Sequence, residues 1–348
     1  MSDLKVGEPI GVLRHGWFAG VDDYAIAGGW TGGGEALVVA DAAGGLCAFD
    51  ARNGKEAWAK PQSHEGGILS LDLRPGHSEV ATAGQDGRVV VRRVDDGEEL
   101  CALDVGEGWI DNVAWSPDGK WLAASCSKRV SVFGSDGREV WRSDDQPSTI
   151  SALAWSGAGE LAAACYGRVA FFGAAAGELR QEFTWQGSLV SMALSPDGEY
   201  VVCGSQDNSV HFWRRSTGQD SRMGGYPAKP SALAFDPTGE YLATGGGDTA
   251  IVWNFSGDGP EGTSPGYLEL HDQLITTLAW ACRGRCLATG ARDDTVAIWS
   301  IQRDGQGKGI GGAILDDIVS SLCWRPDGRA LAALDAQGGV TAWRVGNK

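Results

Sequence analysis

The chain repeats one short pattern of apolar and polar positions eight times along its length. Each copy starts at an anchor residue, followed by two small or polar residues, an apolar residue, a small residue and a large apolar residue. Successive copies are 43, 42, 40, 39, 41, 45 and 44 residues apart, with anchors near Ala25, Ile68, Ile110, Ile150, Leu189, Pro230, Ile275 and Val319. A repeat of about 40–45 residues is typical of a β-propeller, in which each repeat forms one four-stranded blade.

Turn residues divide each copy into strands. In the third copy, the apolar segment from Ile110 to Trp115 leads through Ser116-Pro-Asp-Gly119 to a second apolar segment that begins at Trp121. Proline favours the second position of a tight turn, and glycine accepts the positive φ that such a hairpin needs. A third segment rich in branched and aromatic residues follows, such as residues 207–213 in the fifth copy. A less regular fourth segment leads to the next anchor, so each copy is expected to fold as one four-stranded antiparallel sheet.

These residues resemble the WD40 repeat family over essentially the whole chain. In that family a histidine, a serine or threonine, an aspartate and a tryptophan form a hydrogen-bonded tetrad within a blade. The seventh copy has the right residue type at every matching position: His271, Thr289, Asp293 and Trp299. The second copy has Arg92 where the tryptophan stands but matches at the other three positions: His64, Thr82 and Asp86. The resemblance implies a structural role for both sets and, for the protein, a role as a scaffold for other macromolecules.

We expect an all-β fold, an eight-bladed β-propeller of four-stranded antiparallel blades that forms a single domain over residues 1–348. The eighth copy ends with its third strand, residues 339–343, and five residues follow it. Residues 9–13 precede the first anchor and resemble the outer strand of other copies, so we predict that this N-terminal segment completes the last blade. Borrowing this strand would close the ring and remove an exposed strand edge.

Charge and composition narrow the functional classes. The 29 Lys and Arg residues against 45 Asp and Glu residues give a formal net charge of -16, which repels the phosphates of nucleic acids. No apolar run approaches the ~20 residues that span a bilayer, and the first residues lack the apolar core of a signal peptide. The 8 cysteines are too sparse for a disulfide framework. We therefore expect a cytoplasmic protein with reduced cysteines that binds neither nucleic acid nor a membrane.

Acidic residues recur at one position of the repeat, three residues before the anchor. Five copies that are contiguous in a closed ring have them, and two aspartates adjoin: Asp22, Glu65, Glu107, Asp272 and Asp316, with Asp23 and Asp317. The fourth, fifth and sixth copies have Pro147, Gln186 and Pro227 there instead. Because equivalent loops of a propeller emerge on one face, this pattern predicts an acidic docking surface for a basic, Lys- or Arg-rich protein partner. The alternative is that these acids only keep the protein soluble.

Most of the 15 tryptophans fall on strands and are expected in the core. Trp17, Trp109 and Trp185 differ, because they fall in the loops that lead into a blade. We predict that these three contact the partner and provide an aromatic anchor beside the acidic residues. The alternative is that they pack between blades, since tryptophan is usually buried.

No arrangement of residues indicates catalysis or a bound cofactor. The 5 histidines lack the spacing of a zinc site, and Gly32-Gly-Gly34 lacks the Gly-Lys-Ser/Thr ending of a phosphate-binding loop. Cys282 and Cys286 flank a turn, which leaves a redox or metal role open, although two thiols do not fill a tetrahedral site. We expect no enzyme, metal or cofactor, but a non-catalytic protein–protein interaction scaffold or accessory subunit. The alternative is a sensor or accessory protein that holds a small ligand or metal ion in the propeller channel.

Overall fold

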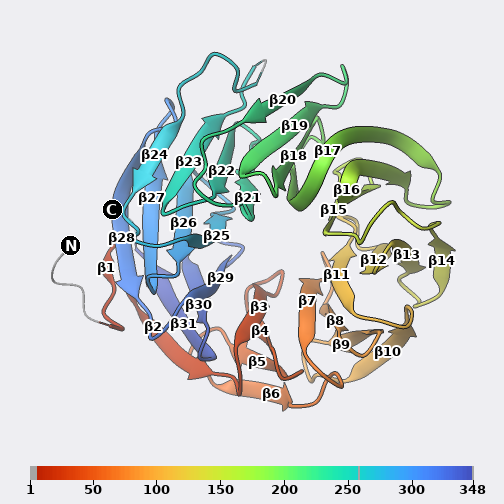
Figure 1. The fold of residues 1–348 in the computed structure, drawn as a ribbon. Coiled ribbons are helices and arrows are strands. Elements are labelled where there is room, and N and C mark those ends of the chain that lie inside the picture. Colours follow the sequence, from red (N-terminus) through yellow and green to blue (C-terminus); the bar gives the residue numbers. More distant parts are fainter. Residues whose placement is uncertain (1–5, 258, 347–348) are drawn as a thin grey trace.

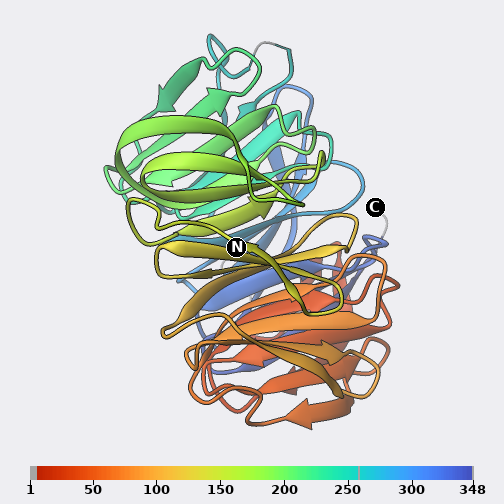
Figure 2. The same cartoon turned by 90° about the vertical axis from the view of Figure 1, so that its right-hand side faces the viewer.

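A closed ring of β-sheets surrounds an open centre in the computed structural model, which describes residues 6–257 and 259–346 (Figure 1). Figure 2 shows from the side how the sheets are inclined around the ring. The prediction of a β-propeller is confirmed. Within the described residues, the fold offers no helix with the length and apolarity that crossing a bilayer requires.

Three four-stranded sheets follow one another along the first part of the chain. Sheet 1 contains β3 (Ala25–Trp30), β4 (Ala36–Asp41), β5 (Leu46–Asp50) and β6 (Glu56–Lys60). Sheet 2 contains β7 (Ile68–Leu73), β8 (Glu79–Gly84), β9 (Arg88–Arg93) and β10 (Glu99–Asp104). Sheet 3 contains β11 (Ile110–Trp115), β12 (Trp121–Cys126), β13 (Arg129–Gly134) and β14 (Glu139–Arg142). The first strand of each sheet is the innermost and begins at a predicted anchor.

The last part of the chain forms three further sheets, two of which include N-terminal strands. Sheet 5 contains β21 (Ala232–Phe235), β22 (Tyr241–Gly245), β23 (Thr249–Asn254) and β24 (Gly266–Glu269). Sheet 6 contains β25 (Ile275–Trp280), β26 (Cys286–Ala291), β27 (Thr295–Ile301), β28 (Gly307–Ile314) and the short β1 (Ile10–Gly11). Sheet 7 contains β29 (Val319–Trp324), β30 (Ala330–Asp335), β31 (Gly339–Val345) and β2 (Leu13–Gly20).

Sheet 4 has six strands and is built from the fourth and fifth sequence copies. Its strands are β15 (Ala152–Trp155), β16 (Glu160–Gly173), β17 (Leu179–Leu194), β18 (Tyr200–Ser205), β19 (Ser209–Arg214) and β20 (Asp220–Met223). The described residues therefore form seven sheets. With each hydrogen-bonded sheet counted as one blade, the prediction of eight four-stranded blades is wrong.

The strand β17 explains this difference, because it belongs to both sequence copies. Its first part pairs with β16, where Thr184 lies opposite Arg168, and its second part pairs with β18, where Leu189 lies opposite Ser205. Residues 185–188 stay in the sheet between these two parts, where other copies have a loop. The repeat period locates strands, but it does not reveal whether hydrogen bonding stops between one copy and the next.

The ring closes through the N-terminal strand β2, which pairs with β31 from Leu13 opposite Val345 to Gly20 opposite Gly339. The predicted closing segment, residues 9–13, is therefore wrong, since its strand β1 pairs with β28 of sheet 6 instead. Gly11 permits the chain to pass so close to β28. Its φ is +69°, and a Cβ atom there would lie 2.1 Å from the Ile310 carbonyl oxygen.

Tryptophans join neighbouring sheets by donating indole N–H groups to carbonyl oxygens across each boundary. On the inner strands, four such bonds of 2.9–3.0 Å run to the preceding sheet: Trp30 to Cys323, Trp155 to Ala114, Trp280 to Ala234 and Trp324 to Ala279. On the outer strands, three bonds run to the following sheet or copy: Trp17 to Ala51 at 2.9 Å, Trp58 to Val94 at 2.6 Å and Trp141 to Ala174 at 2.7 Å. The core is thus a series of apolar layers between sheets, tied by polar contacts at their edges.

Candidate functional site

The loops that lead into the inner strands all lie at one end of the ring, which we call the loop face. Each of these loops packs against the turn between the second and third strands of the preceding sheet. The backbone bonds that show this include Val21 N to Gly338 O, Ser63 N to Gly44 O and Val105 N to Gly87 O, at 2.9, 2.9 and 3.2 Å. Equivalent positions of the repeat therefore do lie at equivalent places on one face.

The five predicted acids three residues before the anchors are all exposed on the loop face: Asp22, Glu65, Glu107, Asp272 and Asp316. Asp23 is exposed as well. Asp317 is half-buried and accepts hydrogen bonds from Ile318 N at 2.7 Å and Gln337 Nε2 at 3.0 Å. Asp317 therefore holds the loop in shape, whereas the other six carboxylates face solvent.

Two further acids near Asp316, Asp294 and Asp335, were not predicted as part of this surface. Burial raises the pKa of both side chains, and neighbouring carboxylates raise it further. Asp335 accepts a hydrogen bond from Gly339 N at 2.8 Å, so it also shapes its turn. The repeat could have indicated both residues, because the turn between the second and third strands lies on the loop face in every sheet.

The region around Pro147, in the fourth sequence copy, contains more charged side chains than the repeat pattern predicted. Asp144 and Asp145 are exposed just before this proline, and Asp145 Oδ1 lies 2.5 Å from Arg129 Nε. Arg168 pairs with Glu182 in the same sheet. Two of the carboxylates in this sector are thus paired with arginines, unlike the five acids above, whereas Asp144 forms no ion pair within 4.0 Å among the described residues.

The three predicted contact tryptophans lie in different environments. Trp109 is 58% exposed and stands on the lead-in loop of β11, next to Gly108. Trp17 lies in β2 and is half-buried, with its ring 6.3 Å from Trp30 and against Gly54. Only Trp109 of these three thus presents a largely exposed ring on the loop face. Trp17 packs between sheets 7 and 1, because the closing strand lies a few residues later in the sequence than predicted.

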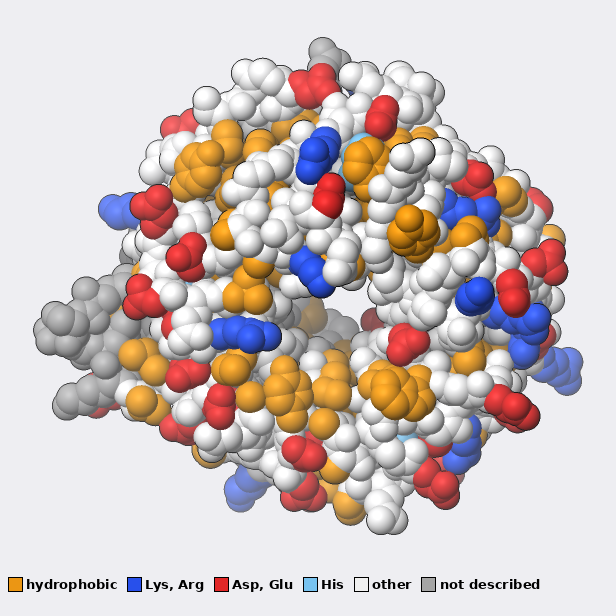
Figure 3. Space-filling view, viewed as in Figure 1, with side chains coloured by type: hydrophobic (Ala, Val, Ile, Leu, Met, Phe, Trp, Pro, Cys, Tyr) orange, Lys and Arg blue, Asp and Glu red, His pale blue; other side chains and the backbone are white. Residues whose placement is uncertain are grey.

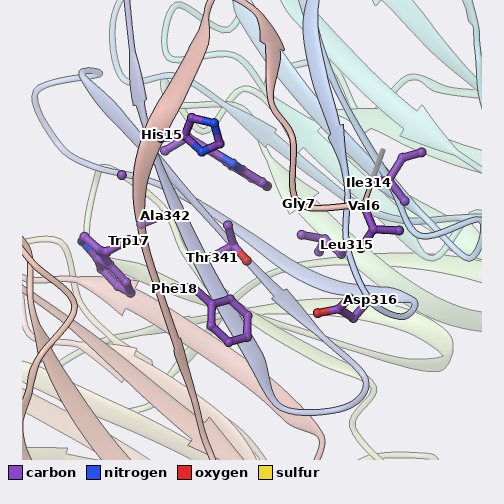
Figure 4. A pocket seen from close by; sticks show the side chains of 12 residues that line it. Val6, Gly7, His15, Trp17, Phe18, Ile314, Leu315, Asp316, Thr341 and Ala342 are labelled. Carbon is purple, nitrogen blue, oxygen red and sulfur yellow. The ribbon is translucent and has the colours of Figure 1, made fainter. Parts of the chain in front are cut away.

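An apolar hollow of about 430 Å³ adjoins the acids at the outer edge of sheets 6 and 7 (Figure 4). Phe18 and Asp316 lie on facing sides of it, while Trp17 is on the other side of β2 from Phe18. Phe18 is 64% exposed. Phe18 was not predicted as a site residue, because the closing strand, which places Trp17 and Phe18 on opposite sides, was expected to lie earlier in the sequence.

The seventh sequence copy contains the complete tetrad geometry. His271 Nε2 lies 2.7 Å from Thr289 Oγ1, and its Nδ1 lies 3.3 Å from Asp293 Oδ1. Trp299 Nε1 donates to the same threonine oxygen at 3.0 Å. All these contacts are internal to sheet 6, so the tetrad is a structural element rather than a surface site.

The second copy replaces the tryptophan of the tetrad with a charged network. His64 bonds to Thr82 Oγ1 at 2.8 Å and to Asp86 Oδ1 at 3.0 Å. Arg92 turns away from that threonine and donates to Ser63 Oγ at 3.1 Å and to Glu99 at 3.0 Å. The guanidinium is buried among these partners.

A third polar cluster of this kind lies in sheet 5, and the sequence analysis missed it because a tyrosine replaces the histidine. Tyr226 Oη lies 2.8 Å from Thr244 Oγ1, and Trp253 Nε1 donates to both oxygens, at 3.0 and 3.2 Å. Burial raises the pKa of Tyr226 to about 12, so the phenol keeps its proton at neutral pH. Tyr226 and Thr244 stand at the same distances from their anchor as the tetrad histidine and threonine do in the second and seventh copies, so the repeat pattern could have indicated this cluster.

The fifth copy has a stacked pair in place of a tetrad. Trp185 stands where other copies have the histidine, and its ring stacks on His211 with centroids 3.8 Å apart. His211 is buried, and its Nε2 lies 3.3 Å from Asp220 Oδ2, although neither ring nitrogen makes a well-aligned hydrogen bond in the described structure. Burial lowers the pKa of His211 below its usual range, and the Asp220 carboxylate opposes that shift.

The cysteines and histidines do not gather into a metal site within residues 6–257 and 259–346. No three His, Cys, Asp or Glu side chains there are arranged to hold a metal ion. Cys282 is exposed and Cys286 is half-buried, and both are free thiols. A redox role for this pair stays a hypothesis.

Family comparisons agree with the fold. A family model described as "WD domain, G-beta repeat" matches residues 98–134, 177–214, 223–254 and 262–300. A model described as "Outer membrane protein assembly factor BamB" matches residues 30–114. Protein hir1 of Schizosaccharomyces pombe is 24% identical over 342 residues, which cover 80% of this chain and 36% of that protein. Protein HIR1 of Yarrowia lipolytica is 30% identical over 180 residues, which cover 44% of this chain and 14% of that protein. The chain therefore spans little more than a third of the first relative's length.

Solved structures show the same architecture at lower sequence identity. The computationally designed Ika8 protein has a TM-score of 0.81 and 21% identity, with 94% of this chain and 98% of that chain covered. The RRP9 WD40 repeats have a TM-score of 0.66 and 17% identity, with 81% of this chain and 95% of that chain covered. These likenesses show the fold alone. Together with the strand pairings, they show that the chain folds as a β-propeller, and the family match identifies WD40 repeats in four segments of it.

Proposed function

We propose that the protein is a non-catalytic interaction scaffold whose loop face docks a basic segment of a partner protein. Its likeness to WD-repeat proteins supports the general role, because such propellers typically bind proteins. The finer proposal, that the partner is basic, rests on the five exposed acids. Cytoplasmic location is part of the same proposal and rests on the sequence alone.

One observation carries the proposal: the five acids are exposed and have no ion-pair partner. In the described part of the chain, none of Asp22, Glu65, Glu107, Asp272 and Asp316 lies within 4.0 Å of a Lys, Arg or His nitrogen. Many acids at the opposite end of the ring are paired, such as Asp118 with Lys120 at 2.8 Å. Unpaired carboxylates at the centre of a docking surface attract a basic partner and speed its association.

Two exposed aromatic side chains stand beside these acids. Trp109 follows Glu107 by two residues, and Phe18 faces Asp316 across the apolar hollow. A Lys or Arg side chain combines an apolar stem with a charged end, so it can contact an aromatic ring and a carboxylate together. Figure 3 shows acidic and basic side chains interspersed around the ring when it is viewed along its axis, so charge alone does not mark a site. An unpaired carboxylate next to an exposed aromatic ring marks a docking site more specifically than charge alone does.

A labelled lysine-rich peptide tests this proposal by fluorescence anisotropy. The five-acid variant D22N/E65Q/E107Q/D272N/D316N should bind the peptide at least about tenfold more weakly, because each exposed charge contributes a few tenths of a kcal/mol. A matched control neutralises five exposed acids at the opposite end of the ring: E35Q/D95N/D136N/E240Q/D304N. This control has the same net charge and should retain binding.

Equal loss in both five-site variants would refute the proposal, because it would mean that net charge alone attracts the peptide. W109A should also weaken binding while leaving the melting temperature nearly unchanged, since the ring is 58% exposed. Wild-type binding of W109A would remove this residue from the docking surface.

A further inference from the structure

The boundary between sheets 7 and 1, where the ring closes, contains a groove of about 510 Å³ at the end opposite the loop face. Four arginines line it: Arg52, Arg325, Arg329 and Arg344. Arg52 lies in the turn after β5, Arg325 and Arg329 lie in the turn between β29 and β30, and Arg344 lies near the end of β31. The protein has a formal net charge of -16, so a cluster of four guanidinium groups stands out against the rest of its surface.

Within the part of the chain that the structure describes, two of these arginines form ion pairs with carboxylates. Arg52 Nη2 lies 2.6 Å from Asp50 Oδ2, and Arg325 Nη2 lies 2.8 Å from Asp327 Oδ2. Among residues 6–257 and 259–346, no carboxylate oxygen lies within 4.0 Å of the guanidinium group of Arg329 or Arg344, although Asp327 Oδ1 accepts a hydrogen bond from the Arg329 backbone N–H at 2.9 Å. Arg344 Nε instead donates to the His15 carbonyl oxygen at 3.3 Å. The groove therefore has a local excess of positive charge that an anion could neutralise.

The apolar wall of the groove is fixed by close packing. Trp17 forms part of this wall, and its indole is held by the bond to the Ala51 carbonyl oxygen. Gly16 lies so near to β31 that a Cβ atom would be 2.2 Å from the Ala342 oxygen. The stem of Arg325 packs on Gly34, where a Cβ atom would lie 2.8 Å from Arg325 Cγ. These contacts fix the wall and one arginine before any ligand arrives, which lowers the entropic cost of binding.

We propose that this groove binds a phosphate monoester, carried as a phosphorylated serine or threonine side chain by a partner protein. A phosphate monoester has nearly two negative charges at neutral pH and three acceptor oxygens. Arginine forks match such oxygens in pairs, and the two arginines without carboxylate partners match the double charge. The acidic remainder of the protein surface disfavours the same ligand elsewhere. This inference concerns the opposite end of the ring and does not depend on the proposed function of the loop face.

The test uses three labelled peptides that share a glycine-rich sequence and differ at one central residue, which is phosphoserine, serine or glutamate. Fluorescence anisotropy at fixed ionic strength should show saturable binding of the phosphoserine peptide, with the other two at least about tenfold weaker. R329Q/R344Q should weaken phosphoserine binding about 10- to 100-fold. R329K/R344K preserves the charge but removes the planar forks, so it should also weaken binding, by about threefold or more.

Two controls make the result decisive. R129Q/R138Q removes the same charge from arginines outside the groove and should bind the phosphoserine peptide like the wild type. The five-acid loop-face variant should also retain this binding, which separates failure of this inference from failure of the proposed function. No saturable binding to the wild type, equal binding of the glutamate peptide, or an equal loss in R129Q/R138Q would overturn the proposal. If R329Q/R344Q does not fold, unchanged binding by R329K/R344K would overturn it.

Discussion

Replacing Trp17 with alanine should destabilise the protein, because this side chain packs between sheet 7 and sheet 1, where the ring closes. Its ring packs against Gly54 and lies 6.2 Å from the Phe49 ring, and its N–H donates to the Ala51 carbonyl oxygen at 2.9 Å. A fully buried tryptophan loses about 3–5 kcal/mol on truncation to alanine. Trp17 is half-buried, so we expect a loss of about 2–3 kcal/mol in the free energy of unfolding.

Urea unfolding followed by circular dichroism would measure this loss. W17F keeps most of the ring contact and removes the indole N–H, so it should lose about 1 kcal/mol. W109A is the matched control, since its ring is 58% exposed, and should change stability by no more than about 0.5 kcal/mol. A W17A protein as stable as W109A would refute the assignment of Trp17 to the closing boundary.

Two further predictions concern buried polar groups. T289V should lose about 1–3 kcal/mol of unfolding free energy in urea, because it removes the oxygen that both His271 and Trp299 bond; wild-type stability would contradict a structural tetrad. Burial lowers the pKa of His211 in the folded protein, so the unfolded chain takes up its proton first and stability falls as pH drops below about 6.5. H211F retains stacking on Trp185 and should reduce this loss between pH 7.5 and pH 5 in thermal unfolding, whereas an unchanged pH dependence would show that other groups cause it.

The apolar period predicted the strands well because each inner strand needs the same buried face. β3, β7, β11, β25 and β29 all begin at a predicted anchor. The repeat predicted the wrong number of blades, because hydrogen bonding continues through β17 according to how residues 185–188 are held and not according to a repeated residue. It also predicted the wrong position for the closing strand. The actual strand lies a few residues later, which places Trp17 at the boundary between sheets 7 and 1 and not in a loop.

The charged sites differ in how far the sequence could reveal them. The five loop-face acids occupy one repeat position, so the sequence alone predicted that they share a face. The arginine groove could not be found in this way, because Arg52 and Arg344 are far apart in the sequence and meet only through ring closure. Phe18 was missed because the closing strand was predicted too early in the chain, and the exposure of Phe18 depends on which residues of β2 face outward.

Hydrogen–deuterium exchange with and without the lysine-rich peptide would show whether the unpaired acids form the docking surface. We expect slower exchange in the lead-in loops of the loop face, residues 20–24, 62–67, 105–109, 271–274 and 315–318. We expect no change in turns at the opposite end, such as residues 31–35 and 95–98. Protection confined to those opposite turns, or spread evenly over both ends of the ring, would contradict this docking surface.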